Sequence, residues 1–468
     1  MNKNKKIIYI ITGIFTSMFA LLIIYLGYFT TVKQKQISVH PYNTRLSNIE
    51  QEVVRGDIYD THMKLLATTV NDKRQYPKGS LYAHAVGYVQ KGKTGIEALA
   101  NTELLYPNYD VISLFKNAFF SEKFQGRDIV LTLDDRYQSA AQKAMKGKKG
   151  GVIIIEPNTG KIKAMYSNPG FDPNNINKDW ESLIQDKKNS PLLNRVTNGL
   201  YPPGSTFKIL TTLAYMNQNN GKPLDFINDC QGEIEGDGYK IQCYNKTVHG
   251  KLDLKKAFNK SCNTYFVKLS ETVTIKSLKS IAEKLGFNHT LHFDMDYAKS
   301  KFQLTETDTP FEKAATYIGQ GKTLATPLHM AMIASCIAND GVVMKPYLLD
   351  YSINKKGRVK VKYLPQYEEA LLNQETAKSL QQMMIGVVKE GTAIKLKRNQ
   401  IVVGGKTGTA QNESSLDHSW FVGFAKYPNE EKNQIAFAVV IENAGKGAKA
   451  LDVTENILEV YETIKSSK

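Results

Sequence analysis

The stretch YPPGSTFK, residues 201–208, decides how the rest of the chain is interpreted. Its two prolines and its glycine disfavour a helix, whereas STFKILTTLAYM, which begins at Ser205, has a helical pattern. Ser205 is therefore predicted at a helix N-terminus, where free backbone N–H groups and the helix dipole favour negative charge. Lys208 follows one turn later on the same face. Because a serine hydroxyl needs a base to become a good nucleophile, a neutral Lys208 is the candidate base.

A second motif, SCN at residues 261–263, follows the helix-like segment DLKKAFNK. The hydroxyl of Ser261 could relay a proton, and the amide of Asn263 could donate a hydrogen bond to a substrate. Cys262 between them is interpreted as a small packed residue and not as a nucleophile.

A third motif, KTGT, ends the strand-like run IVVGG. Lys406 supplies a second cation, which together with burial would favour the neutral form of the first lysine. Thr407 and Thr409 offer hydroxyl groups to a substrate carboxylate. Gly408 lets another stretch of backbone pass close by.

Each motif alone is weak, because the chain contains others like it. S-x-x-K recurs at Ser113 and at Ser352, and K-T-G recurs at Lys93. Only the set that begins at positions 205, 261 and 406 combines a nucleophile at a helix start, a triad between helices and a K-T-G on a strand. S-x-x-K with a later serine triad and K-T-G is the signature of penicillin-binding proteins and β-lactamases.

On these residues the chain resembles a short class B penicillin-binding protein, a monofunctional transpeptidase. The similarity covers nearly the whole chain after residue 54. Its segments are RGDIYD (55–60), YPKGSLYAHAVGYV (76–89), GIEALAN (95–101), LTLDDRYQSAAQKAM (131–145), PLLNRVTNGLYPPGSTFK (191–208), HGKLDLKKAFNKSCNTYF (249–266), GQGKTLATPLHMAMIASCIANDG (319–341), VVKEGTA (387–393) and WFVGFAKYP (420–428).

The resemblance implies a D,D-transpeptidase that cross-links peptidoglycan stem peptides through a serine acyl-enzyme and that β-lactams inhibit covalently. It implies that the catalytic residues are Ser205, the nucleophile, Lys208, its base, and Ser261, Asn263 and Lys406. Thr407, Gly408 and Thr409 would bind substrate, and the backbone N–H groups of Ser205 and Thr409 would form the oxyanion hole. No cofactor and no metal are expected.

The order of the elements predicts an α+β fold with an antiparallel sheet flanked by a helical subdomain. GGVIIIEP–NTGK–IKAMYSNP, residues 150–169, is typical of a β-hairpin. Helical patterns dominate from about 205 to 340, and strand-like runs return at IVVGGKTGTA, WFVGFAKY and IAFAVVIE. The helical segment VTENILEVYETIKS closes the chain. Strands, then helices, then strands indicate α+β and not a parallel α/β sheet.

The N-terminus contains an apolar run without charge from Ile7 to Phe29, which as a helix would cover about 35 Å and cross a bilayer. Lysines 3, 5 and 6 precede this run and only lysines 33 and 35 closely follow it, which favours a cytoplasmic N-terminus. We therefore predict four parts: a cytoplasmic tail (1–6), a transmembrane helix (7–29), a pedestal or dimerisation-like module (30–127) and an extracellular transpeptidase domain (128–468).

The formal net charge of +16 suits anionic lipids or wall polymers, whereas the predicted topology argues against nucleic acid as a partner. The 98-residue module is too short for the glycosyltransferase domain of bifunctional relatives. By resemblance, the partner that polymerises glycan strands would be a SEDS-type membrane glycosyltransferase.

Two other enzyme classes have partial signatures. Residues 87–94 match the Walker A pattern, but the module around them is too small for a nucleotide-binding core and would lie outside the cell. A β-lactamase or a β-lactam sensor of the same fold remains the alternative. EALLN at 369–373 resembles the deacylation motif of class A β-lactamases, although it falls far after Asn263.

The four cysteines are too few for a disulfide scaffold. Cys230 and Cys243 lie in a glycine-rich stretch, where a disulfide is possible outside the cell and the spacing leaves the question open. Cys336 lies in an apolar run typical of a protein core. His289 and His292 have no third ligand nearby in the sequence, so they do not predict a metal site.

Overall fold

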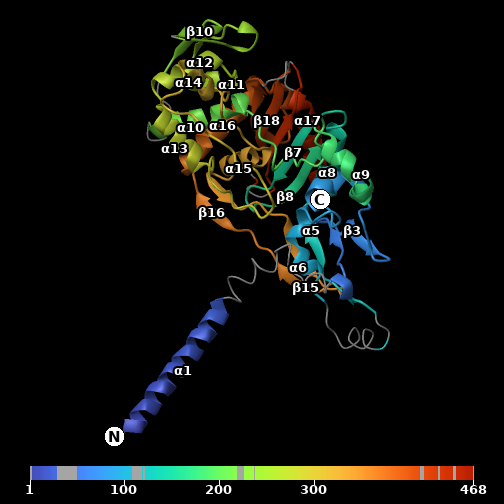
Figure 1. Cartoon of the computed structure of the whole chain (residues 1–468). Coiled ribbons are helices and arrows are strands. Elements are labelled where there is room, and N and C mark those ends of the chain that lie inside the picture. The colour runs from blue at the N-terminus through green and yellow to red at the C-terminus, as the bar shows by residue number, and fades with distance from the viewer. Residues whose placement is uncertain are drawn as a thin grey trace.

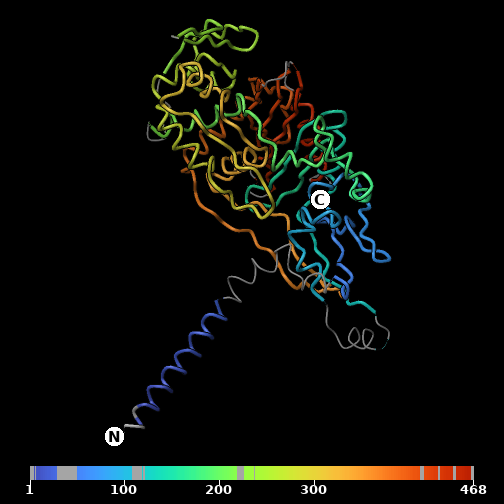
Figure 2. Tube along the Cα trace, in the orientation of Figure 1, coloured from blue at the N-terminus to red at the C-terminus, as the bar shows by residue number. Residues whose placement is uncertain are grey.

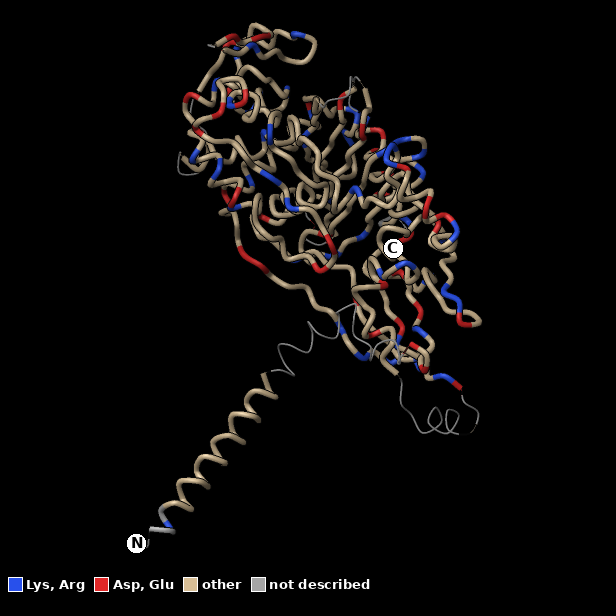
Figure 3. The backbone as a smooth tube through the Cα atoms, in the orientation of Figure 1, with Lys and Arg blue, Asp and Glu red and all other residues tan. Residues whose placement is uncertain are grey.

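The computed structural model describes residues 3–28, 50–107, 119, 122–218, 226–236, 238–411, 416–428, 430, 433–445 and 449–466. Helix α1, Lys3–Tyr28, contains the apolar run, and in Figure 3 its only blue segment is at the N-terminal end. Its segment Ile7–Tyr28 has a mean hydropathy of 2.5 and is long and apolar enough to cross a membrane. The helix fits a single-pass membrane anchor, as the sequence predicts.

A five-stranded antiparallel sheet forms the centre of the catalytic part of the chain, in the order β17-β18-β19-β7-β8. Its strands are β7 (Gly150–Ile155), β8 (Ile162–Asn168), β17 (Val402–Ala410), β18 (His418–Lys426) and β19 (Ile435–Ile441). The predicted hairpin is confirmed, because β7 and β8 pair directly. The β-branched and aromatic side chains of the central strands are buried because helices cover the sheet.

The helices α15 (Pro327–Ala338) and α16 (Gln374–Glu390) pack on the sheet on one side, whereas α8 (Asp135–Ala144) and α17 (Lys449–Ser466) pack on the other (Figure 1). Helix α15 is buried nearly all round, as its run PLHMAMIASCIA predicts. It begins where the side chain of Thr326 accepts a hydrogen bond from the backbone N–H of His329, with a proline in the first turn.

A helical subdomain lies beside this sheet, at the upper left of Figure 1. Its helices are α10 (Lys208–Gln218), α11 (Leu254–Asn259), α12 (Asn263–Lys268), α13 (Ile275–Lys284) and α14 (Pro310–Tyr317). Two short antiparallel pairs lie with them, made of β9 (Asn228–Cys230), β10 (Glu233–Gly236), β11 (Tyr239–Gln242) and β12 (Gly250–Leu252). The predicted α+β fold, an antiparallel sheet flanked by helices, is confirmed.

A second sheet has six strands in the order β15-β14-β6-β2-β3-β4. They are β2 (Ile58–Tyr59), β3 (Leu65–Val70), β4 (Lys73–Gln75), β6 (Asp128–Leu131), β14 (Leu349–Ile353) and β15 (Val359–Lys362). The sequence did not predict that β14 and β15 would join it. Figure 2 shows the orange trace returning to the blue one at this sheet. The boundary between residues 127 and 128 stays a prediction, since strands from both sides of it share one sheet.

The remaining elements are short, apart from one further helix. They are β1 (Val53–Val54), β5 (Phe124–Gln125), β13 (Val342–Met344), β16 (Tyr367–Ala370), α4 (Ala83–Val86), α5 (Gly95–Leu99), α6 (Asn101–Leu104), α9 (Ile176–Gln185) and the 3-10 turns η2 (Gly79–Tyr82), η3 (Pro173–Asn175), η4 (Gly204–Phe207), η5 (Tyr244–Lys246), η6 (Leu269–Glu271) and η7 (Ile394–Leu396).

A buried ion network holds together the described part of residues 50–127, which we call the lower module. The carboxylate of Glu97, which is fully buried, lies between the guanidinium groups of Arg55 and Arg74. Burial alone would raise the pKa of Glu97, but the two guanidinium groups outweigh burial and hold it below its usual value. The segments RGDIYD and GIEALAN, far apart in the sequence, thus meet through one carboxylate.

Candidate active site

Ser205 lies in the 3-10 turn η4, which leads directly into helix α10. The predicted helix start is therefore shifted: α10 begins at Lys208, and the serine occupies the tighter turn before it. The turn is held locally because the hydroxyl of Thr206 donates to the carbonyl oxygen of Pro203 over 2.6 Å. Ser205 itself is half-buried, whereas the neighbouring residues of the turn are buried.

The turn that carries Ser205 packs tightly against strand β17, which carries the third motif. Gly204 has a φ of +53°, and a Cβ at this position would lie 2.5 Å from the carbonyl oxygen of Thr409. A Cβ on Gly408 would lie 2.9 Å from the carbonyl oxygen of Pro203. Only glycine allows both approaches, so these two glycines place the backbone of Ser205 beside that of Thr409.

Lys208 is fully buried and joins the first motif to the second. Its Nζ donates to the carbonyl oxygen of Ser261 over 2.8 Å and to Oδ1 of Asn263 over 2.7 Å. Burial lowers the pKa of Lys208 to about 8, although thiolates at Cys262 and Cys243 would oppose that shift. A neutral amine has two N–H groups and one lone pair. Two carbonyl-type oxygens accept from Nζ and Oγ of Ser261 is a third neighbour at 3.3 Å, so the amine can act as a base only after it has lost a proton.

Asn263 is held at both ends of its side chain. Its Oδ1 accepts from Lys208, and its Nδ2 donates to the carbonyl oxygen of Gln242 over 2.7 Å. The sequence predicts that this amide could donate to a substrate, and that stays a prediction. In the structure the side chain has contacts inside the protein, where it orients the amine of Lys208.

Lys406, on β17, completes a chain of polar groups. Its Nζ donates to Oγ of Ser261 over 2.8 Å, and the Nζ of Lys208 lies 3.3 Å from the same hydroxyl. Burial and the neighbouring Lys208 both lower the pKa of Lys406 well below its usual value. Ser261 adopts a φ of +55°, a strained conformation for a residue with a Cβ. That conformation turns its carbonyl oxygen and its hydroxyl toward the two lysines.

The threonines of the third motif differ in exposure. The hydroxyl of Thr407 is buried and lies 2.6 Å from that of Thr392, whereas Thr409 is half-buried. Nε2 of Gln320 donates to the carbonyl oxygen of Thr409 over 3.4 Å. Sequence reasoning missed Thr392 and Gln320 as neighbours of the site. Both lie in segments that carry the resemblance, VVKEGTA and GQGKTLATPLHM, which was the only available signal.

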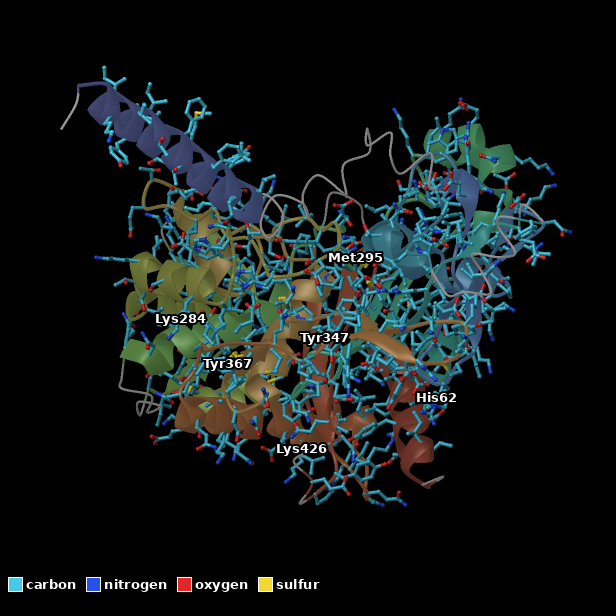
Figure 4. The ribbon with its side chains drawn as sticks, turned by 90° about the horizontal axis from the view of Figure 1, so that it is seen from below. His62, Lys284, Met295, Tyr347, Tyr367 and Lys426 are labelled. Carbon is cyan, nitrogen blue, oxygen red and sulfur yellow. The ribbon has the colours of Figure 1, made fainter. Side chains whose placement is uncertain are left out.

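A hollow of about 600 Å³ elsewhere in the molecule contains none of the motif residues. Its lining includes Leu99 from the lower module and Met295 and Tyr347 from later in the chain. Figure 4, seen from below, labels Met295 and Tyr347 on this side of the molecule. The three motifs that begin at positions 205, 261 and 406 therefore place the candidate chemistry at Ser205 and not in this hollow.

The structure also argues against a phosphate-binding loop at residues 87–94, which match the Walker A pattern. Gly87 follows helix α4 and not a strand, so the strand–loop–helix context of a phosphate-binding loop is missing. The lysine of the match, Lys93, lies 2.7 Å from the carboxylate of Glu50. Glu369 of the EALLN segment lies in the exposed strand β16, which pairs with β13 and not with the sheet that carries Lys406.

A half-buried serine three residues before a buried lysine, with a second serine that bridges this lysine to another buried lysine, matches the motif set of penicillin-binding proteins and β-lactamases. Residues 150–459 match the penicillin binding protein transpeptidase domain, and the chain belongs to this family. The predicted membership and the predicted transpeptidase fold are both confirmed.

Among curated relatives, PbpA of Mycolicibacterium smegmatis, a peptidoglycan D,D-transpeptidase, is 30% identical over 443 residues, which cover 86% of this chain and 87% of the relative. MrdA of Acinetobacter baumannii, also a peptidoglycan D,D-transpeptidase, is 29% identical over 453 residues. That match covers 83% of this chain and only 66% of the relative, so the chain spans about two thirds of its length.

Solved structures agree. The D,D-transpeptidase domain of a peptidoglycan glycosyltransferase from Eggerthella lenta has a TM-score of 0.78 at 31% identity, covering 89% of this chain and 100% of that one. Penicillin-binding protein A of Mycobacterium tuberculosis, as an imipenem acyl-enzyme complex, has a TM-score of 0.79 at 28% identity, covering 88% of this chain and 99% of that one.

Proposed function

We propose that this protein cross-links peptidoglycan stem peptides as a D,D-transpeptidase, with Ser205 as the residue that forms the acyl-enzyme. The observation that carries the proposal is the pair of buried lysines around Ser261, because it supplies a base for Ser205 without a histidine or a carboxylate. The curated relatives are D,D-transpeptidases, and the M. tuberculosis relative forms an acyl-enzyme with imipenem, which supports the same chemistry here.

In acylation, the lone pair of Lys208 takes the proton of the Ser205 hydroxyl as Oγ attacks the carbonyl carbon of the penultimate D-Ala. The backbone N–H groups of Ser205 and Thr409 stabilise the oxyanion, an effect worth about 3 kcal/mol per donor. The bond to the terminal D-Ala then breaks, and its nitrogen receives a proton through Ser261. The acceptor amine later attacks the ester, loses a proton to the same relay and releases Ser205.

Strand β17 supplies the groups that hold the donor peptide. Lys406 and the hydroxyl groups of Thr407 and Thr409 bind the terminal carboxylate, while Gly408 leaves room for the peptide backbone. The hydroxyl of Thr407 is hydrogen-bonded to that of Thr392, so its position is set before substrate binds.

The experiment is mass spectrometry of the purified protein after incubation with a β-lactam. We expect one lasting adduct on the peptide that contains Ser205, and none in Ser205→Ala. Ser352→Ala is the matched control, since Ser352 belongs to another S-x-x-K but is buried in the second sheet. Label on another residue would contradict the assignment. Rapid turnover of the drug without a lasting adduct would favour the alternative, a β-lactamase.

We also propose the topology and the division of the chain. The N-terminus is cytoplasmic, α1 spans the membrane once, and residues 128–468 act outside the cell. Residues 30–127 form a non-catalytic pedestal, and β14 and β15 extend its sheet. This pedestal docks a SEDS-type membrane glycosyltransferase. The lysines in the first turns of α1, before its apolar run, support the cytoplasmic N-terminus.

A further inference from the structure

The segment that precedes Ser205 is tied to the catalytic sheet by side chains that the proposed mechanism does not use. Tyr201, which lies before the two prolines of the first motif, is buried, and its hydroxyl donates to Oε1 of Glu442 over 2.7 Å. Nε of Arg195 donates to the same oxygen, also over 2.7 Å. We call Tyr201, Glu442 and Arg195 the tyrosine clamp.

The guanidinium group of Arg195 gives the clamp a rigid base. Arg195 is buried, and its Nη2 donates to the carbonyl oxygen of Asn189 over 2.6 Å, whereas its Nη1 donates to that of Ser190 over 3.1 Å. Because Nε donates to Glu442, all three nitrogens of the planar group are engaged and its orientation is fixed. Glu442 directly follows β19, so both the sheet and the guanidinium group place its carboxylate.

The side chain and the backbone of Tyr201 are both held in place. Burial and then the Glu442 carboxylate raise the pKa of Tyr201 well above its usual value, so the hydroxyl keeps its proton and remains a donor. Gly199 leaves the space for the ring, since a Cβ at this position would lie 2.5 Å from Cε2 of Tyr201. The backbone of Tyr201 exchanges two hydrogen bonds with that of Ala325, over 3.0 and 2.8 Å.

The ring of Tyr201 lies against β18, the strand that pairs with the third motif. It contacts His418 and Trp420 edge to face, with ring centroids 5.5 and 6.0 Å away. In the sheet, His418 and Trp420 pair with the two neighbours of Thr409. Nε1 of Trp420 also donates to the carbonyl oxygen of Pro202 over 3.1 Å. The segment before the nucleophile is therefore joined to the part of the sheet that supports Thr409.

We propose that Tyr201 is a positioning residue for acylation and that the tyrosine clamp holds Ser205 in a fixed place beside Thr409. This inference rests on the proposed function, because it concerns the two backbone N–H groups that would stabilise the oxyanion. Glycines at 204 and 408 permit the close approach of turn and strand, whereas the clamp fixes their relative position. Both donors must point at one oxygen atom, so a small shift between them weakens the stabilisation.

The first test separates binding from chemistry in the reaction with a fluorescent β-lactam. Tyr201→Phe keeps the ring and its packing and removes only the hydroxyl. We expect its acylation rate at saturating drug to fall about tenfold, while the drug concentration at half saturation changes less than about twofold. The reason is that the groups of β17 that bind the drug carboxylate are unchanged, whereas the nucleophile is displaced.

Tyr82→Phe is the matched control. Tyr82 is also buried, and its hydroxyl also donates to a carboxylate oxygen, Oδ1 of Asp135, over 3.0 Å. It lies in η2 of the lower module, outside the catalytic sheet. Both variants should lower the midpoint of chemical unfolding, but only Tyr201→Phe should slow acylation.

A double-mutant cycle tests whether Tyr201 acts through Glu442. Glu442→Gln keeps an oxygen that can accept from the phenol, so this variant should retain more of the acylation rate than Glu442→Ala. Tyr201→Phe combined with Glu442→Ala should acylate no more slowly than Glu442→Ala alone, because the two side chains act as one unit.

Parent-like acylation by Tyr201→Phe would overturn the inference, and this outcome does not depend on how the Glu442 variants fold. Equal slowing of Tyr201→Phe and Tyr82→Phe, or additive losses in the cycle, would also overturn it. If Ser205 of the parent protein carries the lasting adduct while Tyr201→Phe acylates at the parent rate, this inference fails and the proposed transpeptidase chemistry stands. If the adduct of the parent lies elsewhere, the proposed function fails first.

Discussion

Among single residues, Lys208 carries the sharpest prediction. If its lone pair takes the proton of Ser205, Lys208→Arg should be as damaging as Lys208→Ala, because a guanidinium keeps the charge but cannot accept a proton. We expect both variants to lose acylation by about 10²-fold or more in a stopped-flow assay with a fluorescent β-lactam. If Lys208 acts only through its charge, the arginine variant will retain most of the parent rate. Near-parent thermal unfolding of Lys208→Arg would show that the loss is chemical.

Individual motif residues were also the part of the site that the sequence predicted best. Hydrogen bonds join Lys208, Ser261 and Lys406 in the structure, and order, spacing and local context had identified these residues jointly. The convergence of Cys230, Cys243, His249 and Cys262 was missed, although all four residues stand within one stretch. Cys230 and Cys243 lie 13 residues apart, and Cys243 and Cys262 lie 19 apart, which matches no short zinc-binding pattern. Their convergence depends on two short strand pairs that periodicity does not reveal.

Among the elements, the contact between η4 and β17 decides whether the nucleophile faces its oxyanion hole. Gly204→Ala should disrupt this contact, because the added Cβ would meet the carbonyl oxygen of Thr409 at 2.5 Å and because φ is +53°. Gly147→Ala is the matched control, since its φ is +74° but nothing lies within 4 Å of the added Cβ. Both variants should lose about 1 kcal/mol of unfolding free energy from the backbone strain.

Only Gly204→Ala should also lose acylation, by at least about tenfold, since one oxyanion donor is displaced. The rate of β-lactam acylation, measured beside chemical unfolding of the same samples, separates the two effects. Equal acylation by the two variants would mean that the turn and the strand can shift apart without harm to the chemistry, against the geometry described above.

Sequence reasoning predicted elements better than it predicted how they pair. The hairpin of β7 and β8 follows from local turn chemistry, so it could be predicted directly from the sequence. The pairing of β14 with β6 joins Leu349 to Leu131, and no local signal encodes so distant a partner. For the same reason, residues 128–468 looked like one unit in the sequence, although β14 and β15 extend the sheet of the module before them.

The molecule as a whole combines a membrane helix, a lower sheet and a catalytic body. In Figure 3, Lys and Arg positions alternate with Asp and Glu positions along the described backbone of the body. The net charge of +16 favours attraction to anionic surfaces. Specific partners must be recognised by smaller surface features, and we expect these features on the lower module.

The tip of the hairpin formed by β3 and β4 is the part of the pedestal that we would change first. Val70 and Lys73 are exposed there, at the far edge of the six-stranded sheet. Deleting the whole module would be uninformative, because it would remove β2, β3 and β4 from a sheet that β6 and β14 also need. The double variant Val70→Asp/Lys73→Glu changes the surface and leaves the sheet intact. Lys187→Glu, on an exposed loop of the catalytic body, is the matched control.

We expect the double variant to acylate Ser205 at the parent rate, because the hairpin tip lies in a different sheet from β17. If the pedestal docks a membrane glycosyltransferase, the same variant should fail to co-purify with one and should not support wall synthesis in cells, whereas Lys187→Glu should do both. Loss of acylation in the double variant would show that the module is an integral part of the catalytic fold. Full wall synthesis with both variants would mean that this edge of the pedestal is a spacer that contacts no partner.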